Sequence, residues 1–294
     1  MTKQNSRSQS GDDKERISNE EIVDFFFKKC KRIKKLSQNL SNRGKIFLGI
    51  CKTKLAELFS KFEENQSEIE ENYSPCLCPD QYVGQLKCQP EKTKKEEDNF
   101  IKRIDIFESD TVNLTARFKE ILESPKIRSP FMILILESPH KNEFDKDGKP
   151  IGPARGTTGD NIVSPLRNVF FTYTESRREH HLILMNAIPF QCSLGVSSGT
   201  FRDEVFAKSW EEEEKKFEER LDSLLKALNG KTVVIVNACT QEKVGKKKRR
   251  QNVTESIKKV IRTYKSVKEL WEAPHPSSSW WFVEKCWKEI PIER

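Results

Sequence analysis

The sequence predicts an α/β fold, a three-layer sandwich around a mainly parallel four-stranded sheet, preceded by an N-terminal helical region. Two observations lead to this prediction. Four apolar runs without alternation follow Pro125, and such runs are typical of strands that are covered on both faces. Segments with helical periodicity separate these runs, and strands that alternate with helices build α/β sandwiches. The runs are 131–136, 181–190, 232–239 and 266–273, and the helical segments are 160–173, 209–228 and 252–264.

The first third of the chain differs from the rest in composition. Its first 16 residues are polar and rich in Ser, Gly, Gln and charge, which favours a disordered tail. Apolar residues then recur at helical spacing up to about Tyr73. The expected division is a tail over 1–16, a helical accessory region over 17–110 and a catalytic domain over 111–294. The smaller elements expected are a loop over 74–98, a strand within 99–109 and a helix over 114–124.

Charge and hydropathy limit the class of protein. The chain carries 53 Lys and Arg against 45 Asp and Glu, a formal net charge of +8. A positive field favours an anionic partner such as nucleic acid, because it raises the rate of association. No apolar run reaches the roughly 18 residues of a membrane helix, and the N-terminus lacks the apolar core of a signal peptide. We therefore expect no membrane partner, a cytoplasmic location and a monomer, although the sequence does not decide the oligomeric state.

Three of the eight cysteines, Cys76, Cys78 and Cys88, lie close together. A tetrahedral metal site needs a fourth ligand, and no histidine is nearby to supply it. The thiols of a cytoplasmic protein stay reduced. We therefore expect loop thiols, no metal and no cofactor.

Polar residues occur at the end of each predicted strand. The first run is followed by ESPH (137–140), the second contains Asn186, the third ends in NACT (237–240) and the fourth is followed by HPSSSWW (275–281). In open parallel sheets, ligands bind beyond the carboxyl ends of the strands. The sequence therefore predicts a single site at this edge of the sheet.

In their order and spacing, these segments resemble the uracil-DNA glycosylase superfamily. LESPHKNEF (136–144) resembles its first motif, an acidic or amide residue near a proline. LILMNAIPF (182–190) resembles the second, an asparagine that ends an apolar strand, and HPSSSWW resembles the third, His-Pro-Ser after the last strand. DGKPIGPARGTTG (147–159) also resembles the stretch after the first motif in the branch with iron–sulfur clusters. The resemblance covers about residues 125–294 and implies a DNA glycosylase that flips out and hydrolytically excises a base, leaving an abasic site.

The chain departs from the family pattern at two positions. Ser138 stands where the main branch has its water-activating Asp or Asn, and Ile151 stands where the aromatic platform for a flipped uracil would lie. The four-cysteine cluster of the similar branch is not recognisable. The resemblance implies uracil as the base removed, whereas these departures favour a modified pyrimidine. Excision of either base would serve DNA repair or defence against phage with modified DNA. One alternative is a catalytically inactive DNA- or partner-binding module on the same fold, and another is an enzyme that cleaves nucleosides.

The chemistry assigns roles to the residues at the strand ends. Breaking an N-glycosidic bond makes the sugar resemble an oxocarbenium ion and places negative charge on the departing base. His275 is the candidate that hydrogen-bonds the base oxygen as this charge develops. Glu137 with Ser138 would position water or face the sugar cation, and Asn186 would read the base edge because an amide both donates and accepts. Purely structural roles remain open for each, such as a loop histidine, a turn asparagine and a glutamate paired with Arg155.

The remaining candidates surround the same edge. The loop GPARGTTGD (152–160) offers backbone N–H groups to a phosphate. The basic run KVGKKKRR (243–250) suits phosphate contacts, with a solvated loop as the alternative. Trp280 and Trp281 could enter the space left by a flipped base. Alternatively, Trp281, Phe282 and Trp287 could form the core face of a last helix. Ile151 and His140 are assigned to base binding, and DNA contacts are expected from Arg155, Lys246, Lys247, Lys248, Arg249, Arg250, Ser277 and Trp280.

Overall fold

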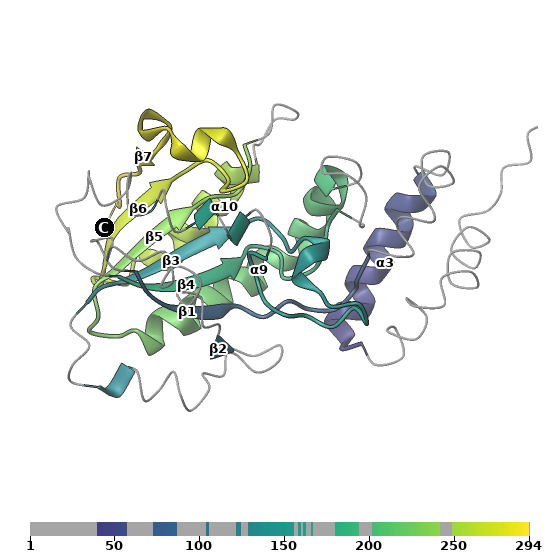
Figure 1. Cartoon of the computed structure of the whole chain (residues 1–294), viewed down its shortest axis with the longest axis horizontal. Helices are drawn as coiled ribbons and strands as arrows, with labels where there is room; N and C mark the ends of the chain where they lie inside the picture. Colours follow the sequence, from purple (N-terminus) through teal and green to yellow (C-terminus); the bar gives the residue numbers. More distant parts are fainter. Residues whose placement is uncertain are drawn as a thin grey trace, which may run out of the picture.

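Seven strands form one sheet at the centre of the molecule (Figure 1). The computed structural model describes residues 40–57, 73–86, 104–105, 122–124, 129–155, 158–159, 161–162, 166, 180–193, 202–241 and 249–293. The strands are β1 (Gln81–Leu86), β2 (Ile104–Asp105), β3 (Phe131–Leu136), β4 (His180–Asn186), β5 (Val233–Asn237), β6 (Val267–Glu272) and β7 (Lys288–Glu289). The helices are α3 (Asn42–Glu57), α9 (Arg202–Ala227) and α10 (Arg249–Ile261), with 3-10 turns η1 (Lys141–Glu143), η3 (Ser279–Phe282) and η4 (Glu284–Cys286).

The strand order is β2-β1-β4-β3-β5-β6-β7. The central strands β4, β3, β5 and β6 run parallel, and they are the four apolar runs of the sequence. The strands on either side, β1 next to β4 and β7 next to β6, are antiparallel. The α/β class is confirmed, but the sheet is mixed and has seven strands where the sequence predicted four.

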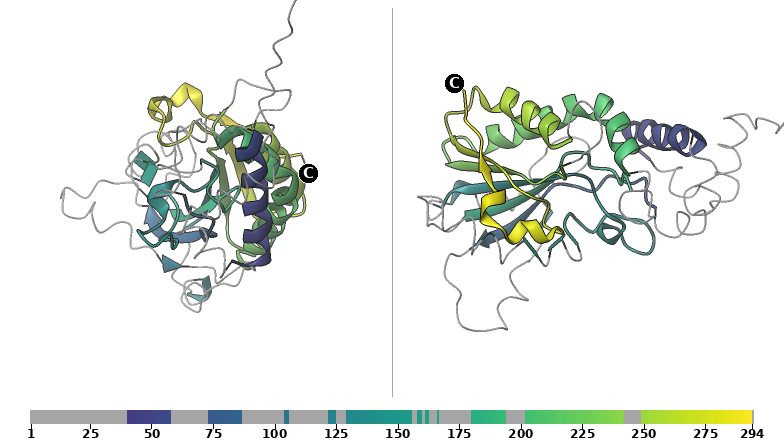
Figure 2. Two further views of the ribbon diagram at one scale, coloured as in Figure 1. Left: turned by 90° about the vertical axis from the view of Figure 1, so that its right-hand side faces the viewer. Right: turned by 90° about the horizontal axis from the view of Figure 1, so that it is seen from above.

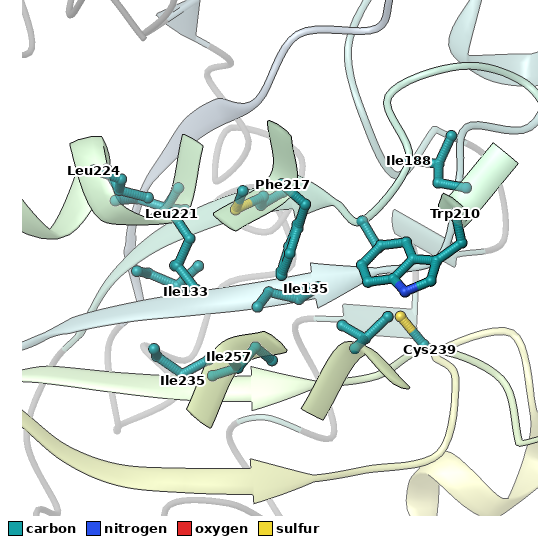
Figure 3. Packing of buried hydrophobic residues seen from close by; sticks show 14 of the residues in the cluster. Ile133, Ile135, Ile188, Trp210, Phe217, Leu221, Leu224, Ile235, Cys239 and Ile257 are labelled. Carbon is teal, nitrogen blue, oxygen red and sulfur yellow. The ribbon is translucent and has the colours of Figure 1, made fainter. Parts of the chain in front are cut away.

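Each face of the sheet is buried under a different cover. Ile133 and Ile135 of β3 face the helical side, where they join one core cluster with Phe217 of α9 and Ile257 of α10 (Figure 3). The alternate residues of β3 belong to a second cluster that includes Trp281. Figure 2 shows α9 and α10 on one side of the sheet and the η3 segment on the other. Because both faces are covered there, β3, β4 and β5 are buried at every position and read as apolar runs, whereas β6 is buried at only some of its positions.

Of the two roles that the sequence left open for Trp281, the core face is confirmed, and insertion into the space left by a flipped base is wrong. This side chain is fully buried, and its indole N–H donates to the carbonyl of Asn161 at 2.9 Å. Trp287 packs on it with ring centroids 4.6 Å apart. Phe282, by contrast, is 49% exposed.

Part of the segment 17–110, which the sequence assigned to a helical accessory region, joins the central sheet, and the prediction of a loop over 74–98 is wrong. The strand β1 lies within that region, inside the predicted loop, and pairs with β4. Its sequence, QYVGQL, is too polar to read as a buried strand, and Gly84 (φ 136°) marks an irregularity in the pairing. A helix is present as α3, and its Phe47 stacks on Phe190 with ring centroids 4.7 Å apart. The tail over 1–16 lies outside the described residues.

The predicted helices at 209–228 and 252–264 are α9 and α10, and both begin several residues earlier than expected. Most of the predicted helices over 160–173 and 114–124 lies outside the described residues. None of the described helices combines the length and the apolar composition that crossing a membrane requires.

Candidate active site

The order of the parallel strands points to one position for a ligand site. The chain passes from β3 to β4 on one side and then, through α9, to β5 on the other side of β3. Such a reversal is a topological switch point, and ligands bind there in the crevice outside the carboxyl ends of the strands. The relevant crevice lies beyond the ends of β3 and β5.

A cavity of about 240 Å³ occupies this position. Its walls come from the segment after β3, from the residues that follow β5 and β6, and from the first residue of α9. The cavity therefore brings together residues that are far apart in the sequence. Among the predicted site residues it collects Glu137, Ser138, His140, Arg155, His275 and Ser277.

Glu137 follows β3 and is only 3% exposed. Its carboxylate forms an ion pair with Arg249, and Arg202 Nε lies 3.2 Å from its Oε1. The Thr240 hydroxyl donates to the same carboxylate. Burial disfavours the charged form, but the two guanidinium groups outweigh burial and lower the pKa of Glu137. The group is therefore ionised, and its charge is balanced by arginines other than the Arg155 that the sequence suggested.

His275 lies just beyond the end of β6, where the sequence placed it. The backbone N–H of Ser277 donates to its Nδ1 at 3.2 Å, and the Ser277 hydroxyl lies 2.8 Å from the same atom. Because Nδ1 accepts a hydrogen bond, the neutral ring carries its proton on Nε2. Burial, supported by neighbouring arginines, lowers the pKa of His275 to about 4. At neutral pH this ring is therefore an uncharged donor through Nε2–H.

Glu143 is a second carboxyl group in the cavity wall, and the sequence analysis did not single it out. It is 3% exposed. Its pKa is raised to about 8 by burial, although backbone N–H groups of His140 and Ala154 and the side chains of Asn186 and Cys78 oppose this shift. The Cys78 thiol lies 3.8 Å from Glu143 Oε2. Glu143 is thus mainly a neutral carboxylic acid at pH 7.

Asn186 ends β4 as predicted, but it does not line the cavity. Its backbone N–H donates to Asp80 Oδ1 at 3.3 Å, and its carbonyl accepts from Arg220 at 2.7 Å. Arg220 also bonds both oxygens of Asp80, at 2.7 and 2.6 Å, so that a buried ion pair fixes the end of β4. Within the described residues, neither atom of the Asn186 amide has a hydrogen-bond partner of normal geometry. Its amide lies behind Glu143, whose pKa it lowers.

The sequence predicted that Arg249 contacts DNA, but its side chain is buried. It is 3% exposed, and its guanidinium bonds Glu137 and Asp203 and lies 4.8 Å from the centroid of the Phe206 ring. A buried carboxylate needs a charged partner, and Arg249 supplies it. In this structure its side chain is not available to a phosphate, which corrects the prediction.

The other predicted basic contacts divide into three groups. Arg250 is half-buried, and its Nε donates to the carbonyl of Cys239 at 2.7 Å. Arg155 lines the cavity, and its guanidinium donates to the carbonyl of Ile151 at 3.0 Å. Lys246, Lys247 and Lys248 lie outside the described residues.

Ile151 is 41% exposed and is not among the residues of the cavity wall. Its backbone N–H donates to the carbonyl of Glu143 at 2.8 Å. Gly152 follows with φ 116°, and a Cβ at that position would come within 2.3 Å of the Gln81 side chain. The glycine therefore lets this loop lie against β1, and Ile151 anchors Glu143 through its backbone. His140 lines the cavity and accepts the Asn142 N–H at 3.4 Å.

Two exposed aromatic side chains stand beside the His275 loop. Trp280 is 58% and Phe282 49% exposed on η3. The Ser278 hydroxyl accepts the Trp280 N–H at the start of this turn, and the Asn161 amide donates to the carbonyl of Pro276 at 3.0 Å. The loop that carries His275 is thus held in place while Trp280 faces solvent.

The described residues contain no group of three or more His, Cys, Asp or Glu side chains that could hold a metal ion. Cys76 is partly exposed and Cys78 is buried, while Cys88 lies outside the described residues. Comparisons of the chain with protein-family models, with curated proteins and with solved structures found no match.

Proposed function

We propose that the protein is a DNA glycosylase that hydrolyses the bond between a pyrimidine base and its deoxyribose and leaves an abasic site. The observation that carries this proposal is the neutral His275, which presents an Nε2–H in the wall of a cavity at the switch point of the sheet. The sequence resemblance, which gave the expectation, uses the same histidine.

The chemistry of base departure fits a neutral donor. The glycosidic bond breaks with its electron pair going to the base nitrogen, and the charge spreads to the ring oxygens. A preorganised donor in a site that excludes water is worth about 10²–10³ in rate. His275 supplies this donor without a counter-ion, because its Nδ1 is already occupied by Ser277.

The size and lining of the cavity fit a single ring. Its volume of about 240 Å³ is below the roughly 300–1,000 Å³ typical of drug-sized ligands. The ionised Glu137 lies in the same wall as Ser138. A carboxylate bonded by two arginines is a weak base. We therefore assign two roles to Glu137, a negative charge near the sugar and the positioning of a water molecule. This water adds to the sugar and loses its proton to solvent.

The surface beside the cavity suits DNA. Trp280 is exposed next to the His275 loop, and apolar or aromatic side chains at such positions support an unstacked or flipped nucleotide. Arg155 adds positive charge at the cavity wall.

An inactive binding module is the second candidate. It is favoured by one observation, the pairing of Glu137 with both Arg202 and Arg249, which reduces the ability of this carboxylate to activate water. Such a protein would hold the extruded base in the cavity without breaking its bond.

The test is an excision assay on duplexes that contain uracil or a 5-substituted cytosine, with detection of alkali-labile abasic sites. We expect excision by the unmodified protein, and a loss of about 10²–10³-fold in His275→Ala. Lys226→Ala, a 70% exposed residue near the end of α9, is the control and should keep the full rate. Retention of base-modified DNA without abasic sites would favour the binding module, and a wild-type rate in His275→Ala would remove this residue from the site.

A further inference from the structure

The sequence predicts that Asn186 reads the base edge, but Glu143, and not Asn186, lines the cavity. Glu143 is in the cavity wall, whereas the Asn186 amide lies behind it. A ligand in the cavity therefore meets the carboxyl group of Glu143 before it meets the amide.

The surroundings of Glu143 contain donors and no cationic partner. The carboxyl group is approached by the Cys78 thiol at 3.8 Å and by the backbone N–H groups of His140 and Ala154. No ion pair among the described residues involves Glu143. Arg202 and Arg249 pair with Glu137, Arg220 pairs with Asp80, and Arg155 donates to the carbonyl of Ile151. A buried carboxyl without a counter-charge keeps its proton.

A protonated carboxyl group has an O–H donor directly beside a C=O acceptor. This pair matches the Watson–Crick edge of a pyrimidine, on which a donor and an acceptor are also adjacent. In a uracil-type ring the N3–H would donate to the C=O while O4 accepts the O–H. In a cytosine-type ring N3 would accept the O–H while the exocyclic amine donates to the C=O. An ionised carboxylate offers only acceptors and loses one bond of each pair.

We propose that Glu143, in its protonated form, is the residue that reads the base edge in the cavity, with Asn186 as the positioning residue behind it. This inference rests on the proposed glycosylase function. It defines the substrate class as pyrimidines with an unmodified N3 edge. The ring 5-position is not part of this recognition, so 5-substituted bases belong to the same class as uracil.

The charged and titratable groups around Glu143 come from several elements. The neighbouring segments supply Cys78, whose pKa is raised well above its ordinary value by burial, and His140, whose pKa is lowered by burial. Arg155 lines the same cavity from the loop after η1. Asp80, beyond Cys78, is bonded to Arg220 of α9.

Burial of Glu143 determines how recognition of the base edge should change with pH. Since burial raises the pKa of Glu143 to about 8, the edge-reading form is present below that pH and is lost as the pH rises through it. Replacement by Gln keeps one donor and one acceptor at nearly the same positions and removes the titration.

The experiment combines base binding and excision between pH 6 and 9. Binding of free uracil, cytosine and 3-methyluracil is followed by NMR, and excision is measured on a duplex with the preferred base. We expect wild-type binding and excision to fall above pH 8. Glu143→Gln should stay within a few-fold of wild type at pH 7 without the alkaline fall, and Glu143→Leu should lose at least tenfold in binding. Glu211→Gln, a 64% exposed carboxyl on α9, is the control and should behave as wild type.

The outcomes separate the two proposals. Equal binding of 3-methyluracil and uracil, or an unchanged alkaline fall in Glu143→Gln, would overturn the role of Glu143. Base binding with the expected pH dependence but without excision at any pH would support edge reading and overturn hydrolysis. A wild-type protein that binds none of the free bases and excises none would overturn both. Thermal unfolding of each variant shows whether a loss reflects misfolding.

Discussion

Two buried carboxyl groups, Glu137 and Glu143, line one cavity, and at neutral pH the first is ionised whereas the second is mainly neutral. Both are 3% exposed. Glu137 is held ionised by Arg249 and Arg202, whereas Glu143 has a pKa of about 8 because burial acts on it without a cationic partner. Pairs of groups whose surroundings separate their pKa values are typical of active sites. The comparison teaches that the partner, and not the depth of burial, sets the charge.

The partners of the two groups come from different distances along the chain. Arg202 and Arg249 are the first residues of α9 and α10, more than 60 residues after Glu137. Glu143 is surrounded by groups of its own loop, by the end of β4 and by Cys78. The charged half of the cavity therefore depends on helix packing, and the neutral half depends on the loop after β3.

The largest expected effect comes from removing the charge partner of Glu137. Arg249→Met leaves a buried carboxylate without its main counter-charge and should destabilise the fold by about 3–5 kcal/mol at pH 7. Because the folded pKa of Glu137 is depressed, its stabilising effect is present above the unfolded pKa and is lost as the pH falls through the folded value. Urea denaturation at pH 7 and pH 4 checks this, since the cost should shrink at pH 4. An equal cost at both pH values would show that packing against Phe206 is what was lost.

A smaller effect is expected from the hydroxyl that bonds the same carboxylate. Thr240→Val removes the donor to Glu137 while the arginines remain in place. Hydrogen bonds to charged groups are worth about 1.5–3 kcal/mol, so we expect a loss of that size in urea denaturation and a shift of acid unfolding to higher pH. Thr240→Ser keeps the donor and serves as the control. If both variants lost the same stability, the methyl group and not the hydroxyl would be responsible.

The third effect concerns how the folding stability changes with pH, and it comes from Glu143. A folded pKa near 8 against an ordinary value of 4.5 means that the folded state binds more protons between these values. Stability should therefore decrease from pH 5 to pH 8, by at most about 1.4 kcal/mol per pH unit from this group. Glu143→Gln should flatten that decrease in denaturation measured across the range, and Glu211→Gln should not. An identical slope in wild type and Glu143→Gln would mean that Glu143 is ionised in the folded protein.

The sheet could be predicted because its central strands are covered on both faces. The FMILIL run of β3 carries that signal in its composition alone. The strand β1 could not be predicted, since its polar sequence QYVGQL gains its place only by pairing with β4. Short strands of this kind are selected by tertiary contacts, which local composition does not record.

The sequence predicted where the candidate site lies, but it predicted only some of the residues that line it. His275 and Glu137 lie in the cavity because the strand ends converge at the switch point. Glu143 could not be singled out, although it lies in the same motif as Glu137, because its position at the end of η1 and its burial come from the folded loop. Arg249 was assigned to DNA because a run of basic residues does not show which of its members turns inward to a buried carboxylate.

The pairing of β1 with β4 has a consequence for anyone who divides the chain for expression or for split-protein assays. A fragment that begins at residue 111 would include every motif on which the sequence resemblance rests. It would lack Asp80, the acidic partner of Arg220, and the strand that covers one edge of β4. Such a fragment would expose that edge and leave a buried guanidinium without its counter-ion. The segment 73–86, added as a separate peptide, supplies both of the missing groups and is the natural partner for complementation.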